Sequence, residues 1–132
     1  MSNPSVTNVT GSNPGPNTDT LPDTVQMPTG NIWKLASLTV ALTPASVANA
    51  TSAEQTFTVT NLVLGDVVVV NKPTAQAGLG IVGTRVSAAG VLAITFMNTT
   101  AATITPTAAE SYAIGVLRIQ PNWTQPSTNI DW

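Results

Sequence analysis

The sequence contains no cysteine and no histidine, and only 8% of its 132 residues are charged, against about 25% in a typical soluble protein. Without cysteine, a disulfide scaffold, a thiol nucleophile and a thiolate metal site are excluded, and without histidine the commonest zinc ligand and general base are missing. Four basic and six acidic residues give a net charge of −2. Nucleic-acid affinity depends largely on cationic contacts to phosphate, so a nucleic-acid partner is not expected.

Long hydrophobic runs are also lacking. The longest apolar stretch, residues 62–70, is interrupted by Gly65 and Asp66 and falls far short of the roughly 20 residues that span a bilayer. Residues 1–30 carry no positive charge and no apolar run, so they do not resemble a secretory signal. We therefore expect no membrane partner and a protein that folds in the cytoplasm where it is made.

Residues 1–30 form a proline-rich segment with almost no large apolar side chains. Prolines remove backbone donors and favour extended conformations, and such a segment buries too little apolar surface to order itself. It is either a solvated tail or, as we favour, an extended arm that becomes ordered against a neighbouring subunit by adding to a sheet edge. Single apolar residues spaced along it are the expected interface anchors: Val6, Val9, Leu21, Val25 and Met27.

Residues 31–120 have the composition of an all-β domain, with short runs rich in Val, Ile and Thr between Gly, Pro and Asn turns. Six or seven strands in about 90 residues indicate an antiparallel β-sandwich, a jelly-roll-like domain or a small barrel, with an extended N-terminal arm. The expected strands are residues 32–42, 55–61, 66–71, 80–87, 91–96 and 111–120, with a short additional one at 103–105.

Alternation predicts which side chains face the core. Phe57 and Val59 share one face of their strand and three threonines share the other. In the strands expected at 91–96 and 111–120, larger side chains again fall on one face, and Arg118 joins that face near the end of its strand. Residues 67–70 are apolar on both faces, which indicates either a central strand or one covered by another subunit. The sets expected to face inward are Leu92, Ile94 and Phe96, and Tyr112, Ile114 and Val116.

No arrangement of residues indicates catalysis, a metal or a cofactor. A nucleophilic serine or threonine needs a base, and the folded region offers only Glu54, Asp66 and Glu110 as carboxylates, all at loop or strand-edge positions. We expect them to be solvated charges or surface ion pairs. The spacing Gly78-x-Gly80-x-x-Gly83 matches a phosphate loop only weakly, since a strand follows it, and more simply marks a turn or bulge. The protein is predicted not to be an enzyme.

The C-terminal tail, residues 121–132, is polar but carries two tryptophans. Trp123 and Trp132 are expected to anchor into a partner or sister subunit, with packing on the chain's own domain and contact with carbohydrate as alternatives. Trp33 begins a strand and is expected in the core. Four Asn-x-Ser/Thr sequons, at Asn8, Asn49, Asn98 and Asn122, are close to the number expected by chance and receive no glycosylation role.

The low charge of the sequence is itself informative about how the protein contacts other subunits. A surface of small uncharged side chains can pack against a sister subunit without desolvating many ions. Together with the arm and the tail, this predicts a subunit of a symmetric assembly, with a homotrimer as the plausible unit.

Residues 64–118 resemble small head decoration, cement or head-fibre proteins of tailed bacteriophages. The resemblance lies in GDVVVVNKP, then IVGTRVS, VLAITFMNTT and ITPTA, and a closing YAIGVLR. It covers about 40% of the chain and omits both the arm and the tail.

This resemblance implies a sandwich module on the capsid surface of a virion, assembled with itself and with the major capsid protein. Such a protein stabilises the capsid by binding across joints between capsid subunits, without catalysis. In the matched region Gly65 and Asp66 would form a turn into the next strand, and Arg85 and Arg118 would each pair structurally with a carboxylate such as Asp66 or Glu110. The alternatives are a fibre or receptor-binding module that recognises a host glycan or protein, and a secreted adhesin.

Overall fold

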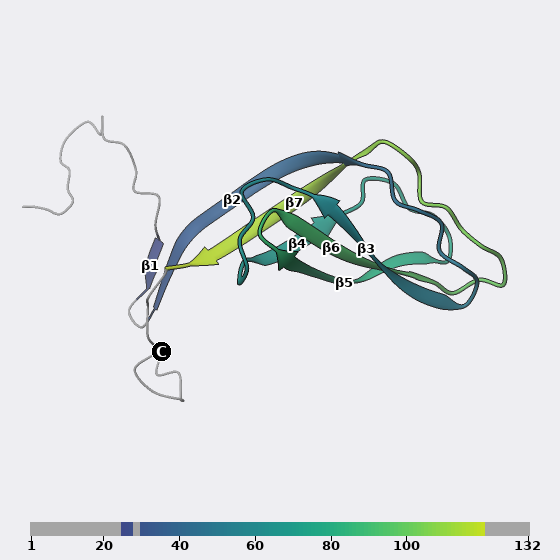
Figure 1. The fold of residues 1–132 in the computed structure, drawn as a ribbon, viewed down its shortest axis with the longest axis horizontal. Coiled ribbons are helices and arrows are strands. Elements are labelled where there is room, and N and C mark those ends of the chain that lie inside the picture. The colour runs from purple at the N-terminus through teal and green to yellow at the C-terminus, as the bar shows by residue number, and fades with distance from the viewer. Residues whose placement is uncertain (1–24, 28–29, 121–132) are drawn as a thin grey trace, which may run out of the picture.

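The chain is a two-layer antiparallel β-sandwich in a computed structural model that describes residues 25–27 and 30–120 (Figure 1). One sheet has four strands in the order β1-β2-β7-β4, and the other has three in the order β3-β6-β5. The expected all-β sandwich is confirmed, and no helix occurs within the described residues. The strands are β1 (Val25–Met27), β2 (Gly30–Leu42), β3 (Thr51–Thr58), β4 (Val67–Asn71), β5 (Leu79–Ala88), β6 (Val91–Asn98) and β7 (Glu110–Ile119).

Strand boundaries differ from the prediction by one or two residues in most strands and by more at three places. β1 and Gly30 lie inside the predicted arm, because residues 25–27 pair with residues 30–32 of the same chain. β3 begins at Thr51 and ends at Thr58, earlier at both ends than expected, because Ala53 and Gln55 continue the alternation in side chains that are too small or too polar to signal a strand. The short strand expected at 103–105 is a single bridge from Ile104 to Val47.

The core lies between β6 of one sheet and β7 of the other. Leu92, Ile94 and Phe96 are completely buried, as their alternation predicts. Tyr112, Ile114 and Val116 face them from β7 and are also buried. Full burial of an aliphatic or aromatic side chain contributes roughly 1.5–3 kcal/mol, so these two central strands carry much of the stability of the fold.

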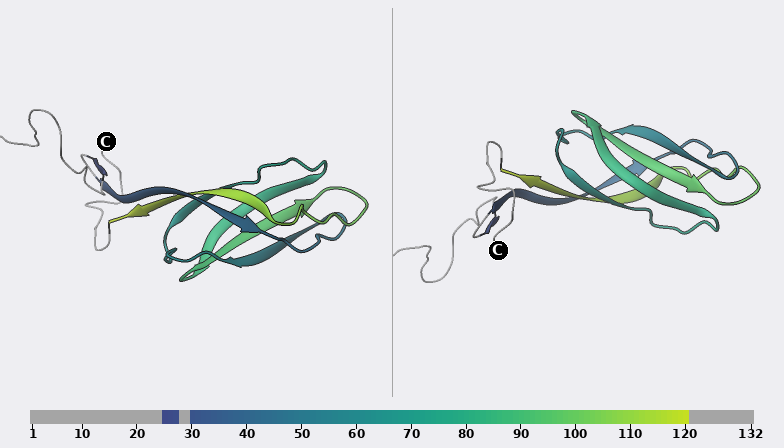
Figure 2. Two further views of the ribbon diagram at one scale, coloured as in Figure 1. Left: turned by 90° about the horizontal axis from the view of Figure 1, so that it is seen from above. Right: turned by 90° about the horizontal axis from the view of Figure 1, so that it is seen from below.

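The two ends of the sandwich differ. The loops at residues 43–50, 72–78 and 99–109 meet at one end, and the turns at 59–66 and 89–90 lie at the other (Figures 1 and 2). β1, the start of β2 and the end of β7 extend beyond the three-stranded sheet at the second end (Figure 2).

Gly78 marks a tight approach between two loops at the first end. Its φ is +79°, and a Cβ added there would lie 2.1 Å from Cγ2 of Thr100. The carbonyl of Gly78 accepts a hydrogen bond from the backbone N–H of Thr99 at 2.8 Å. A bulge follows in β5 between Ile81 and Gly83. The interpretation of these glycines as a turn and a bulge is confirmed.

Asn98 ties these loops together from a fully buried position at the end of β6. Its Nδ2 donates to the carbonyls of Val47 and Ala102 at 3.0 and 2.7 Å, and its Oδ1 accepts from both the N–H and the hydroxyl of Thr100 at 2.9 and 2.8 Å. The amide is therefore satisfied on both sides, which is what a buried polar group requires. A residue buried in this way is unsuited to glycosylation despite its sequon.

We expect Asn98→Ala to lower the free energy of unfolding by roughly 3 kcal/mol, because it leaves several buried backbone groups without a partner. The matched control is Asn71→Ala, which removes an exposed asparagine from β4 and is expected to have little effect. Urea unfolding monitored by circular dichroism measures both. Equal losses in the two variants would contradict the role assigned to Asn98.

Candidate interaction surface

Asp66 and Arg118 form a bidentate ion pair at the end of the sandwich where β1, the start of β2 and the end of β7 extend beyond the three-stranded sheet. Nε and Nη2 of Arg118 donate to Oδ1 and Oδ2 of Asp66, both at 2.6 Å. The Asp66 side chain is completely buried, and that of Arg118 is 17% exposed. The expectation that Arg118 pairs structurally with a carboxylate is confirmed. Asp66 was expected to be a solvated charge or part of a surface ion pair; it forms the ion pair, but in a buried position because Arg118 covers it.

The same carboxylate organises the turn that precedes β4. Oδ2 of Asp66 accepts the backbone N–H of Val63 at 2.9 Å, and the N–H of Asp66 donates to the carbonyl of Val63 at 3.1 Å. Nη2 of Arg118 also donates to the carbonyl of Asn61 at 2.8 Å. Gly65, with a φ of +95°, makes the reversal between them, as predicted. Hydrogen bonds from Arg118 lower the pKa of Asp66 below its usual value of 3.8, against the opposing effect of burial.

Glu110 and Lys72 form a second buried pair, with 2.7 Å between Nζ and Oε2. The Thr74 hydroxyl donates to the other carboxylate oxygen, and the Lys72 ammonium also donates to the Thr74 carbonyl at 2.6 Å. These contacts, first that of Lys72 and then that of Thr74, lower the pKa of Glu110. Of the predicted alternatives, a solvated charge or a surface ion pair, Glu110 forms an ion pair, but the surface location is wrong because the loop after β4 folds over it.

Arg85 and Glu54 form the exposed pair. Nε and Nη2 of Arg85 donate to the two carboxylate oxygens of Glu54, both at 2.8 Å. Arg85 and Thr56 flank Ala93 on the central strand β6, so the guanidinium reaches across that strand. The expectation that Arg85 pairs with a carboxylate is confirmed; the partner is Glu54 rather than either example given, Asp66 or Glu110, and Glu54 lies at the surface as predicted.

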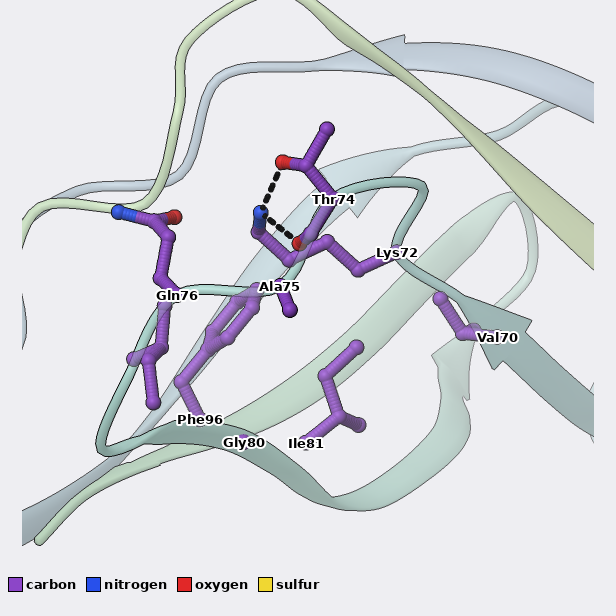
Figure 3. Close-up of a pocket in the computed structure, with 9 residues that line it drawn as sticks. Val70, Lys72, Thr74, Ala75, Gln76, Gly80, Ile81 and Phe96 are labelled. Carbon is purple, nitrogen blue, oxygen red and sulfur yellow. Dashed lines mark hydrogen bonds between the residues drawn. The ribbon is translucent and has the colours of Figure 1, made fainter.

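The hollow in Figure 3 has a volume of about 230 Å³ and is lined by Lys72, Thr74 and apolar side chains of β4, β5 and β6. Ligand sites are usually about 300–1,000 Å³. The Lys72 ammonium points toward Thr74, to which it is bonded (Figure 3). Since its one charged side chain is already bound to groups of the protein, the hollow offers no free charged group to a ligand.

Tyr112 is a buried phenol whose hydroxyl has no hydrogen-bond partner among the described residues. Burial, and secondarily the charge of Glu110, raise its pKa to about 12. It stays protonated at neutral pH, and its side chain does not line the hollow in Figure 3. It contributes to the core rather than to a site.

The outer face of the four-stranded sheet is uncharged and exposes several large apolar side chains. We use "outer face" for the side chains of β2, β7 and β4 that point away from the other sheet. Leu35, Leu117 and Val67 form one row across the three strands, and Ser37, Gly115 and Val69 form the next. Leu35 and Val69 are each 68% exposed, and Val67 is 58% exposed. None of the charged side chains in the described part of the chain belongs to this face.

On this sheet, one of the two alternatives predicted for residues 67–70 is wrong, and so is the core position predicted for Trp33. β4 is not a central strand, because it pairs only with β7 within its sheet; its other predicted possibility, cover by another subunit, stays a prediction. Trp33 is not a core residue but is 39% exposed. It is the extra residue of a β-bulge between Ile32 and Lys34, on the part of β2 that extends past the second sheet, so no core exists there to receive it.

β2 also has an open edge. β7 pairs with one side along its length, whereas β1 pairs with the other side only at residues 30–32. Among the described strands none covers the remaining edge, residues 33–42. Lys34 is the only charged side chain along this stretch. An edge of this length is usually covered or blunted, because its free N–H and C=O groups pair readily with another chain.

The predicted interface anchors fall in different places. Val25 and Met27 belong to β1, whose backbone pairs with β2 of the same chain. Val6, Val9 and Leu21, and the tail residues Trp123 and Trp132, lie outside the described residues. Sequence reasoning missed the outer face, although its signal was present in the two-sided apolar run at 67–70 and in Leu35 and Leu117, which alternate with inward-facing residues.

No family model, no curated protein and no solved structure matches this chain. The described residues contain no cluster of three or more acidic side chains that would hold a metal ion. They also contain no helix long and apolar enough to cross a membrane.

We expect Arg118→Met to lower the free energy of unfolding by roughly 3 kcal/mol, because it leaves the buried Asp66 carboxylate unpaired. The double variant Asp66→Asn with Arg118→Met should recover part of this loss. Arg85→Met, which breaks the exposed pair, is the matched control and should cost far less. Urea unfolding gives all four values, and a double variant no more stable than Arg118→Met would contradict the pairing.

Stability should also fall at acidic pH. The pKa values of Glu54, Asp66 and Glu110 are lowered in the folded protein, so their contribution is present above the unfolded values and is lost as pH falls through the folded ones. With no histidine in the sequence, we expect a constant thermal midpoint between about pH 5 and 8 and a fall below about pH 4. A midpoint that changes between pH 5 and 8 in calorimetry would contradict this.

Proposed function

We propose that the protein is a non-catalytic structural subunit of a tailed-phage virion that decorates the capsid, assembles with itself as a homotrimer and stabilises the head by binding across joints between subunits of the major capsid protein. The observation that carries the proposal is the open edge of β2. Ten residues of that edge lack a strand partner in the described part of the chain, and a neighbouring polypeptide in an assembled particle is what would cover them.

The use of charge supports the same function. The three carboxylates of the described residues all bind a cation of the same chain: Arg85, Arg118 or Lys72. Each is therefore committed to holding the fold, and the rest of the surface is formed mainly by uncharged side chains. Such a surface can be buried against other subunits at a small desolvation cost.

The sequence resemblance is what indicates a phage head as the assembly to which the protein would belong. Its segments correspond to β4, β5, β6 and β7, which include the core strands and both residues of the Asp66–Arg118 pair. The resemblance thus concerns the sandwich body, whereas the open edge and the arm lie outside it and would specify docking on a particular head.

Binding to expanded phage heads that lack the protein tests the proposal. We expect the full-length chain to cosediment with them in a fixed number of copies and to raise the temperature at which the heads open. In solution, light scattering should give a mass near three subunits. Failure to bind such heads, or a mass of one subunit on saturated heads as well as in solution, would contradict it.

Deletion of residues 1–24 tests the contribution of the arm while keeping β1 paired with β2. We expect the shortened chain to keep its β-sheet circular dichroism and thermal midpoint, because the described fold does not include those residues, and to bind heads more weakly. An unfolded product would place the arm in the domain's own core. Unchanged binding would remove the arm from the docking contact.

A further inference from the structure

The two outer faces of the sandwich differ in charge. On the three-stranded sheet, Arg85 reaches across β6 to Glu54, and exposed threonines of β3 and the exposed Met97 accompany them. On the four-stranded sheet, Leu35, Val67 and Val69 are exposed and no charge occurs. One face is thus suited to water, and the other is suited to contact with further protein.

Gly115 gives a second, independent indication that the outer face is covered. It lies in β7 between Ser37 and Val69, and a Cβ added there would meet nothing within 4 Å. Neither a positive φ nor internal packing therefore requires glycine. Since glycine within a strand is destabilising relative to alanine, its presence indicates close approach of another group from outside. With Ala113 it forms a floor of small residues beside Val69.

The size of the face favours a single chain segment over a second subunit. With strands about 4.8 Å apart and a rise of about 3.4 Å per residue, three strands along the length of β7 cover at most roughly 500 Å². A stable interface buries about 800 Å² on each partner. A strip of these dimensions matches one extended segment lying along the sheet.

The tail is the segment placed to do this. It follows Ile119, whose exposed side chain ends β7 beside the outer face. The sequence Gln120-Pro121-Asn122-Trp123 has the pattern of a β-turn, with proline and asparagine at the central positions. β2 and β4 occupy both sides of β7, so a chain that reverses there must run back over a face of the sheet.

Length and chemistry agree with this path. After a turn at residues 120–123, the nine residues 124–132 span up to about 31 Å when extended, which exceeds the roughly 20 Å along β7 from Ile119 to Ala113. The tail contains one charged residue, Asp131, and two tryptophans. The Trp132 indole can reach the small floor formed by Ala113 and Gly115, and Trp123 remains near Ile119.

We propose that residues 121–132 dock on the outer face of their own four-stranded sheet, with Trp132 on the floor formed by Ala113 and Gly115. The inference is independent of the capsid function proposed above. It assigns the tail to the chain's own domain, leaving the open edge of β2 for contact with other subunits.

The test uses the full-length chain with Trp33→Phe and Trp123→Phe, so that Trp132 alone fluoresces. Its emission should be shifted to shorter wavelength, and its quenching by acrylamide reduced, relative to a peptide of residues 121–132. Adding Gly115→Val should move both values toward those of the peptide. The thermal midpoint should not fall, because the space above Gly115 is open and valine favours strands.

Thr58→Val is the matched control, because it places the same side chain at an exposed position of β3 on the other sheet. It should leave the fluorescence unchanged. Peptide-like emission in the parent protein would overturn the proposal, as would protection that survives Gly115→Val. Protection that disappears on dilution as the mass falls to one subunit would also overturn it, since the occupant would then come from a second copy.

Discussion

The pairing of Asp66 with Arg118 connects parts of the chain that the backbone alone leaves independent. One carboxylate closes the turn before β4 through Val63 and binds the guanidinium that ends β7. The same guanidinium reaches the carbonyl of Asn61. These hydrogen bonds therefore position the turn, the edge strand β4 and the end of β7 relative to one another. They lie where the three-stranded sheet stops covering the four-stranded sheet.

Such a pair is costly to bury, and its energetic logic explains why the chain uses charge so sparingly. Removing two ions from water is repaid only when their remaining donors and acceptors are also bonded. Asp66 meets that requirement with a backbone N–H, and Glu110 meets it with the Thr74 hydroxyl beside Lys72. Asn98, which lies with Glu110 at the end of the sandwich opposite Asp66, does the same without charge. The two ends are thus closed by satisfied polar networks, and the apolar core lies between them.

The fold class, most of the strand positions and the inward-facing residues could be predicted from the sequence, because alternation along a strand depends on neighbouring residues. Phe96 and Ile114 are examples. The burial of Asp66 and Glu110 could not be predicted, since it depends on loops and strands distant in sequence that bring Arg118 and Lys72 to them. Arg85 illustrates the same limit, because several carboxylates were equally good partners until the register of β5, β6 and β3 selected Glu54.

The exposure of apolar side chains at the surface could be predicted only in part. The sequence indicated that residues 67–70 were apolar on both sides, but could not distinguish a strand between two others from an edge strand with one bare face. That distinction depends on which strands pair across the whole chain, and here β4 lies at the edge. The exposure of Trp33 has the same origin, because a β-bulge and the end of the second sheet decide it.

The arrangement of the ends makes the molecule directional. β1, the beginning of β2 and the end of β7 lie together at one end, and the loops at 43–50, 72–78 and 99–109 lie at the other (Figure 1). With 13 residues in β2, a body anchored at the first end holds the opposite loops roughly 40 Å away. Those loops are cross-connected by Asn98 and Gln76, so they form a rigid tip. The long axis of the sandwich therefore joins an end formed by paired strands to an end formed by cross-connected loops, and each end can vary in sequence without changing the other.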